Sequence, residues 1–384
     1  MFGMAEQHSL APLASRAHEV GAKLALVQGL LERRGLEAVV LNGSGPVAWL
    51  TGGLTNRIEP GSPASPLWLV VTGAGAAALT TNVERPRLEA ESGLAELEID
   101  VHEAPWYEPG ALERLAEELA GSPRAEIGGL GVDVEDDLVE LRLTLSPEET
   151  ERLSSLGADA ARALEIALRE WSPGERDFDL QARVAELLER AGAFGACLIV
   201  GGDERVERFR HPLAAGEPMH RLVMAVVVAE RHGLHAAATR FACAGGLGES
   251  VRRSRGVALA VEEETLAACE PGATYGDVLG VLDRAYAGAG HPGAWAGHYQ
   301  GGPVGYRQRE FEIVPTQTGS RWFGTSLEVG HAVAWNPSVA GGGKAEDTYL
   351  VGEHGLKRLT DTGAWPLELG RPGVLDISNG EAAL

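Results

Sequence analysis

The stretch "SPGERDFDLQARVAELLERAGA" (residues 172–193) returns 98 residues later as "EPGATYGDVLGVLDRAYAGAGH" (270–291). The constant offset pairs Pro173 with Pro271 and Gly174 with Gly272. Apolar positions also agree in phase, as expected of two amphipathic helices that each follow a Pro-Gly turn. The duplication predicts a pseudo-twofold domain, with its chemistry at the seam where the sheets of the two halves meet.

A helix start precedes the first copy and marks the beginning of this domain. Ser146, Pro147 and Glu149 have the spacing of a capping box with proline at the first helical position. We expect this helix to run to about Trp171, and we assign 145–384 to the duplicated domain.

The residues before this point predict a separate α/β domain. Helical spacing of apolar residues alternates with short apolar runs that are typical of buried strands. The expected helices are 18–34 and 110–122, and the expected strands lie within 36–43, 66–81 and 126–134. We assign 15–140 to this N-terminal domain and 1–14 to a loose N-terminus. The stretch "GSGP" (43–46) is interpreted as a turn, because no phosphate-loop pattern follows it.

Charge and composition exclude several classes of partner. The chain has 384 residues, and 55 acidic against 33 basic residues give a net charge of −22. Nucleic acid and anionic membrane surfaces repel such a chain, so we expect neither as a partner. Three scattered cysteines and the lack of a secretory signal or spanning apolar run fit a cytoplasmic protein.

The segment "MAVVVAERHGLHAAATRF" (224–241) predicts a strand, a tight turn and a second strand. In a strand, residues two apart share a face, so Val226 lies with Met224 and Val228. Its only acid is Glu230, beside the turn. A slip of either strand by one residue brings no aspartate to the face, which predicts an apolar pocket floor.

The order of these segments resembles the pita-bread peptidase family of aminopeptidase P, prolidase and creatinase. The segments that carry the resemblance are "AHEVGAKLALVQGLLERRGLEAVVLNGSGPVAWLTGG", "LSPEETERL", "HGLHAAATRF", "GHYQGG", "LEVGHAVAWNP" and "KAEDTYLVGEHGLKRLT". The resemblance implies an α/β (α+β) fold, with a creatinase-type N-terminal α/β domain before the pseudo-twofold pita-bread domain. It also implies a homodimer.

The same resemblance implies a metal site whose ligands are mostly missing. Active members hold two divalent ions with two Asp, one His and two Glu. Carried over, these positions fall on Val226, Ala237, His298, Asn336 and Glu346. Two neighbouring dications repel strongly, and only a dense set of carboxylates makes the pair bindable. With His298 and Glu346 alone retained, the sequence predicts a degenerate site and no metal cofactor.

Other polar residues fall in or near the site segments. His211 stands where active members place a substrate-side histidine, and we predict His211 and His298 as the catalytic candidates. Arg240 could bind ligand, or it could brace the sheet through a carboxylate such as Glu346. The full set of predicted ligand-binding residues is Arg240, Tyr306, Arg309, Glu310, Asn336 and Glu346. A metal held by His232 and His235 is the weaker alternative to solvated turn histidines.

Three functions remain open from the sequence. The chain is a metal-free binding protein for a small carboxylate-bearing molecule or a short peptide. Alternatively, it is a metal-independent, creatinase-like hydrolase of peptide or carbon–nitrogen bonds, in which a histidine acts as acid and base. An active Xaa-Pro peptidase with relocated metals ranks last, because no other carboxylate set is visible. The sequence leaves open whether any reaction is catalysed and whether a single metal binds elsewhere.

Overall fold

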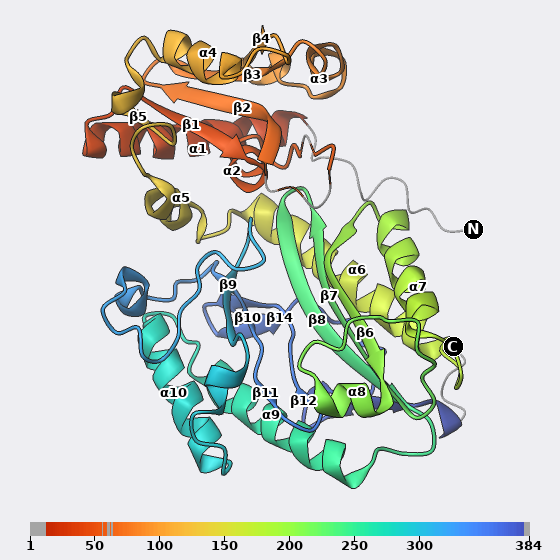
Figure 1. Cartoon of the computed structure of the whole chain (residues 1–384). Helices are drawn as coiled ribbons and strands as arrows, with labels where there is room; N and C mark the ends of the chain where they lie inside the picture. Colours follow the sequence, from red (N-terminus) through yellow and green to blue (C-terminus); the bar gives the residue numbers. More distant parts are fainter. Residues whose placement is uncertain (1–12, 56, 60–61, 63, 380–384) are drawn as a thin grey trace. The chain divides into compact units, whose positions relative to one another are not determined.

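The computed structural model describes residues 13–55, 57–59, 62 and 64–379. The chain forms two compact units: the first ends at Glu149 and includes His232–Leu234, and the second comprises Thr150–Arg231 and the chain from His235 onward (Figure 1). We predicted a loose N-terminus over residues 1–14, and residues 1–12 of it lie outside the described residues. The first helix already begins at Leu13.

The first unit is a five-stranded mixed sheet in the order β4-β3-β2-β1-β5, with α1 and α4 on opposite faces (Figure 1). Its core includes side chains of β1, β2 and β3 that pack on Ala116 of α4. The helices are α1 (Leu13–Arg34), α2 (Ser44–Leu50), α3 (Arg85–Glu91), α4 (Ala111–Ala120) and α5 (Glu135–Arg142), and the strands are β1 (Ala38–Gly43), β2 (Ala64–Thr72), β3 (Gly75–Thr81), β4 (Asp100–Ala104) and β5 (Ile127–Gly128).

Two local predictions in this unit need correction. The stretch 43–46 is not a turn, because Ser44 opens α2 and Pro46 lies in the first helical turn, where a missing N–H costs nothing. The strand expected within 126–134 is reduced to the two residues of β5. Gly129 ends it with φ 81°, and a side chain there would meet the carbonyl oxygen of Val40.

The second unit contains two four-stranded sheets, β17-β8-β7-β6 and β14-β13-β10-β9. The helices are α6 (Pro147–Arg169), α7 (Asp177–Arg190), α8 (Asp203–Arg208), α9 (Glu249–Ala267) and α10 (Tyr275–Gly288), and the strands are β6 (Phe194–Gly202), β7 (Leu222–Arg231), β8 (Leu234–Cys243), β9 (Gly301–Val304), β10 (Ala332–Trp335), β11 (Ser338–Val339), β12 (Gly343–Lys344), β13 (Tyr349–Gly352), β14 (Gly355–Arg358), β15 (Leu367–Glu368), β16 (Arg371–Pro372) and β17 (Val374–Asp376). None of the described helices is both long and apolar enough to cross a bilayer.

The backbone confirms the duplication predicted from the sequence. Helices α7 and α10 begin and end at residues that are 98 apart. The turn before each helix makes the same backbone bond, from Gly174 N to Met219 O and from Gly272 N to Leu327 O, both 2.8 Å. An isolated antiparallel bridge follows in each half, at Arg176 and at Thr274. These matched contacts identify the two halves of the duplicated domain.

The hairpin of the pocket floor forms as predicted. β7 and β8 are joined by His232 (φ 55°) and Gly233 (φ 81°), the two positive φ values of a type I′ turn. Every residue of β8 is buried. The capping box of α6 is also present, with Ser146 N donating to Glu149 Oε2 (2.7 Å) and Glu149 N to Ser146 Oγ (3.2 Å).

Candidate functional site

Lys344 is buried and contacts two of the predicted ligand-binding residues, Asn336 and Glu346, although the sequence analysis did not predict it as a site residue. Lys344, the last residue of β12, donates from Nζ to Asn336 Oδ1 and lies 3.4 Å from Glu346 Oε2. The Lys344 and Glu346 side chains are 3% and 4% exposed. Burial lowers the pKa of Lys344, and the Glu346 carboxylate opposes that change. The two oxygen acceptors therefore share one cation.

Thr239 of β8 contacts the same oxygen of the Glu346 carboxylate. Thr239 Oγ1 donates to Glu346 Oε2 (2.9 Å), and Thr239 N donates to Glu346 O (3.0 Å). Asn336 is held separately, because its N–H donates to Gln300 O (2.8 Å) directly after β10. Asn336, Lys344, Glu346 and Thr239 form a continuous polar chain between the two sheets of the second unit, and we refer to this chain as the seam cluster.

The positions predicted as a missing aspartate pair lie on an apolar surface. Val226 is 4% exposed and belongs to a buried cluster. The other buried members of that cluster are Ile199, Val206, Leu222, Met224, Phe241, Cys243 and Val251. Ala237 is also 4% exposed, and its N–H and C=O both bond to the Thr348 hydroxyl, at 2.8 and 3.0 Å. Neither side chain offers an atom that could bind an ion.

The two candidate catalytic histidines contact each other. The Nε2 atoms of His211 and His298 are 3.1 Å apart, and the ring centroids are 4.9 Å apart. The Nδ1 atom of His298 faces the carbonyl oxygen of Tyr299, which can only accept a hydrogen bond. His298 therefore carries its proton on Nδ1 when neutral, so that His211 Nε2–H is the donor between the rings.

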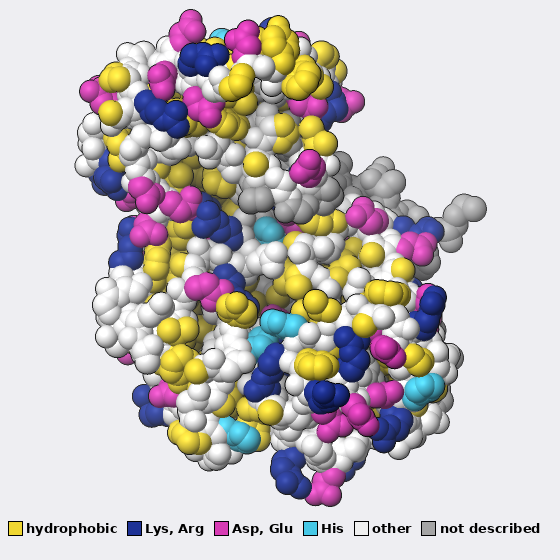
Figure 2. All heavy atoms as spheres, in the orientation of Figure 1, with side chains coloured by type: hydrophobic (Ala, Val, Ile, Leu, Met, Phe, Trp, Pro, Cys, Tyr) yellow, Lys and Arg dark blue, Asp and Glu magenta, His cyan; other side chains and the backbone are white. Residues whose placement is uncertain are grey.

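Charge around this pair favours neutral rings. Burial lowers the pKa of His298 to about 3, with Lys344 acting in the same direction. Burial also lowers the pKa of His211, where Lys344 and Arg309 add to the effect and Glu346 opposes it. Arg309 is partly buried, and its Nε atom is 2.8 Å from Glu312 Oε1. Figure 2 shows histidine and basic side chains next to each other on the visible face of the second unit.

Arg240 has the contacts of a bracing residue. Its guanidinium is buried and donates to Asp347 Oδ1 (2.9 Å), Thr239 O (2.9 Å) and Thr360 O (2.6 Å). The bracing interpretation therefore has the better geometry, with Asp347 and, at 3.8 Å, Glu165 as the carboxylates instead of the expected Glu346.

The loop after β9 is tied to β8 and to itself. His235 N donates to Gly305 O (2.8 Å), and His235 Nδ1 lies 3.3 Å from the same oxygen. The buried Glu310 carboxylate accepts from Tyr306 N (2.6 Å), so these two predicted ligand-binding residues hold the loop in shape. Within the described part of the chain, no three His, Cys, Asp or Glu side chains converge as a metal-binding group.

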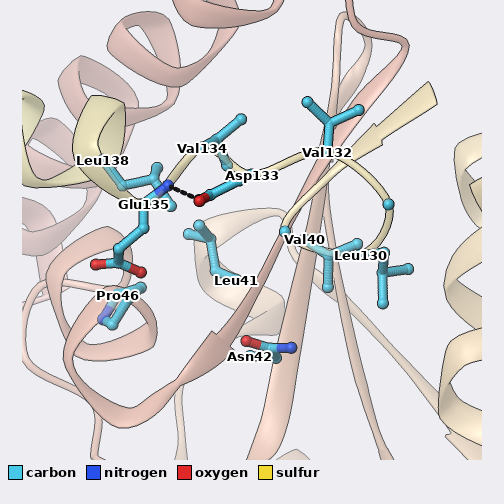
Figure 3. A pocket seen from close by; sticks show the side chains of 12 residues that line it. Val40, Leu41, Asn42, Pro46, Leu130, Val132, Asp133, Val134, Glu135 and Leu138 are labelled. Carbon is cyan, nitrogen blue, oxygen red and sulfur yellow. Dashed lines mark hydrogen bonds between the residues drawn. The ribbon is translucent and has the colours of Figure 1, made fainter. Parts of the chain in front are cut away.

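A pocket in the first unit offers a comparison. It measures about 380 Å³ and lies between the end of β1, the loop 129–134 and the start of α5 (Figure 3). Of its two acidic residues, Asp133 accepts from the backbone N–H of Glu135, two residues further along the chain (2.9 Å). Among the residues that the structure describes there, no arginine, lysine or histidine lines it.

Sequence reasoning missed Lys344 and Thr239, although both are visible in the chain. Lys344 is one of three lysines and precedes Glu346 by two residues, a spacing that puts both side chains on one face of an extended segment. Thr239 shares its face of β8 with Ala237, next to the predicted ligand position.

Comparisons with known proteins agree with this architecture. The family model described as "Metallopeptidase family M24" matches residues 151–353, more than half of the chain. A Xaa-Pro dipeptidase of Pyrococcus furiosus is 25% identical over 237 residues, which cover 60% of this chain and 66% of that protein.

Solved structures show the same fold over most of the chain. Dipeptidase PepE from Mycobacterium ulcerans superposes with a TM-score of 0.74 at 18% identity, covering 94% of this chain and 99% of that one. The prolidase from Pyrococcus horikoshii OT3 gives a TM-score of 0.71 at 19% identity, covering 89% and 98%. With the matched family model and the shared pita-bread fold, the chain belongs to metallopeptidase family M24.

Proposed function

We propose that this M24 member is a metal-independent protein that binds a small carboxylate-bearing molecule or the end of a short peptide at the seam cluster. The observation that carries the proposal is the gathering of Lys344, Arg309 and the His211–His298 pair around one acid, Glu346. Glu346 already contacts Lys344 and Thr239. The charges of Lys344, Glu346 and Arg309 all act on the pKa of His211, which contacts His298. A ligand carboxylate would be a further acceptor for this group, in competition with Glu312 for Arg309.

The residues at the family's ligand positions fit a pair of divalent ions poorly. Val226 and Ala237 bring no oxygen or nitrogen, and Asn336 brings a neutral amide that already accepts from Lys344. Hard divalent ions need several anionic oxygens. Glu346 alone supplies such an oxygen among these five positions, which supports the metal-independent function.

A metal-independent hydrolase is the second candidate, favoured by the contact between His211 and His298. Two imidazoles 3.1 Å apart could pass a proton between them. The pKa of about 3 at His298 makes that ring a weak base near neutral pH, so binding without turnover ranks first. An active Xaa-Pro peptidase, the activity named for the Pyrococcus relative, ranks third for this chain. A cytoplasmic location and a homodimer stay predictions of the sequence.

Calorimetry of paired ligands tests the proposal. Alanyl-proline and glycyl-proline carry a free carboxylate, and their C-terminal amides lack it. We expect the acids to bind at least tenfold more tightly than the amides, as the loss of a charge-assisted hydrogen bond predicts. Arg309→Gln should weaken binding of the acids, and His211→Ala should do the same.

Arg253→Gln is the matched control, because Arg253 also pairs with a nearby glutamate but is exposed on α9. Equal affinity for acid and amide, or equal effects of the two arginine variants, would contradict the proposal. Mass spectrometry of the recovered ligands, with and without chelator, separates the alternatives. Cleavage that persists with chelator favours the hydrolase, and cleavage abolished by chelator favours the metallopeptidase.

A further inference from the structure

We infer that the ammonium group of Lys344 is an internal cation that takes the place of the divalent ions in the seam cluster. Nζ contacts Asn336 Oδ1 and Glu346 Oε2, which are oxygens at two positions where the family resemblance expects metal ligands. This inference concerns the charge of the site itself, and it holds whether or not a carboxylate ligand binds there.

The position of Lys344 is set by the backbone. β12 pairs with β11, with Lys344 opposite Ser338, and Arg255 donates to Lys344 O (3.3 Å). Gly343, just before it, has no room for a side chain, because a Cβ there would lie 2.3 Å from Ser254 O. The chain around Lys344 is therefore fixed, and its side chain points into the cluster at 3% exposure.

The charges balance in the same way as in the metal-bearing arrangement. Two Asp and two Glu, as the resemblance implies, carry four negative charges against the four positive charges of two divalent ions. Here the single acid Glu346 faces the single cation Lys344. A buried cluster needs such compensation, because an unpaired charge inside a protein is costly. With the three other acids absent, the cluster thus holds one acid and one cation.

The lysine also prevents an ion from entering. A divalent ion would have to approach a Glu346 oxygen to about 2.0–2.2 Å, as metal–carboxylate bonds require. Nζ already lies 3.4 Å from that oxygen, so the ion and the ammonium would be close neighbours of like charge. Restoring the acids alone is therefore insufficient for tight metal binding while Lys344 remains.

Titration with manganese alone tests this inference. The triple variant Val226→Asp, Ala237→Asp, Asn336→Glu restores the acids, and a quadruple variant adds Lys344→Met. We expect the quadruple variant to bind Mn²⁺ with a Kd at least tenfold lower than the triple variant, as measured by calorimetry and by metal content after dialysis. The matched control adds Lys357→Met to the triple variant, because Lys357 is an exposed lysine of β14. This control should leave the Kd of the triple variant unchanged.

Three results would overturn the inference: equal Kd values for the triple and quadruple variants, tight binding by the triple variant, or an equal effect of Lys357→Met. If acid at 226 prevents folding, the same comparison is made with Ala237→Asp, Asn336→Glu, with and without Lys344→Met, which leaves the apolar cluster intact. We again expect at least a tenfold difference in the Kd for Mn²⁺ between these two variants, and equal Kd values would overturn the inference. Because no carboxylate ligand is used, this inference and the proposed function can fail separately.

Discussion

Removing the ammonium of Lys344 should destabilise the second unit strongly. Lys344→Met keeps an unbranched side chain, one atom shorter, but leaves the Glu346 carboxylate, 4% exposed, with the Thr239 hydroxyl as its side-chain donor. Breaking a buried pair by removing one partner costs about 3–5 kcal/mol. A double variant that adds Glu346→Gln to Lys344→Met also removes the negative charge that Lys344→Met alone leaves uncompensated.

The size of the coupling follows from the geometry. Two unit charges at the observed 3.4 Å attract by about 5 kcal/mol at an effective dielectric constant of about 20. Screening by solvent is small because both side chains are nearly inaccessible. We therefore expect each single variant to lose about 3 kcal/mol and the double variant to lose far less than their sum, since replacing a whole buried pair is often nearly neutral.

The assay must report on the second unit alone, because a chain of two units need not unfold in one step. Hydrogen exchange of peptides from β8 and from 332–346, followed by mass spectrometry in increasing urea, gives the opening free energy of this region. Lys357→Met is the control and should change it by less than about 0.5 kcal/mol, as exposed substitutions usually do. Additive losses in the double variant, or a Lys344→Met variant as stable as wild type, would refute the reasoning.

Three other predictions concern buried groups of the second unit. Burial raises the pKa of Glu262 to about 8 against 4.5 when unfolded, with Asp347 adding to the effect and Arg371, Arg240 and Arg255 opposing it. The folded state therefore keeps a proton that the unfolded chain loses, so this contribution to stability is complete below pH 4.5 and is lost as pH rises to 8. Urea unfolding at several pH values should show that Glu262→Gln removes this decline, and an unchanged pH slope would contradict the assignment. Arg240→Met should cost about 3 kcal/mol or more, because the buried Asp347 carboxylate loses its charged partner and keeps the Thr360 hydroxyl as a donor. Asp347→Asn in the same chain should partly reverse this loss in thermal unfolding. Val226→Asp should destabilise by several kcal/mol by charging an apolar cluster, whereas Val226→Thr, of similar shape, should cost much less; equal melting temperatures of these two variants would argue against a buried position.

The helical part of this fold was predictable because its signals are local. The Pro-Gly turns and the apolar phase of 172–193 and 270–291 lie within single segments, and both helices form at the predicted 98-residue offset. The capping box of Ser146 and Glu149 is equally local. The predictions at 43–46 and 126–134 were wrong for the opposite reason. Their outcome depends on contacts between segments, such as the close approach of Gly129 to Val40.

The partners of β8 depended on a register that the sequence does not reveal. Adjacent residues of an extended chain point to opposite faces. Because Thr239 N bonds to Glu346 O, Thr239 meets Glu346 on one face while Arg240 meets Asp347 on the other. The sequence offered Glu346 as an example of a carboxylate that could brace Arg240, and the hydrogen-bonded partner is the next residue, Asp347. Which of two neighbouring acids faces the arginine is decided by this cross-segment pairing.

Lys344 is different, because its relation to Glu346 can be seen in three residues of sequence. In "KAE" the two charged residues are two apart and so share a face of an extended segment. In the structure the Lys344 ammonium lies 3.4 Å from the Glu346 oxygen that an ion would have to reach, so this contact, and not the spacing alone, is evidence about the site. Missing acids alone show that a family's ligands are absent. A cation placed against the remaining acid adds that the site's charge is satisfied within the chain, and this is why we expect removal of Lys344 to decide whether restored acids can bind a metal.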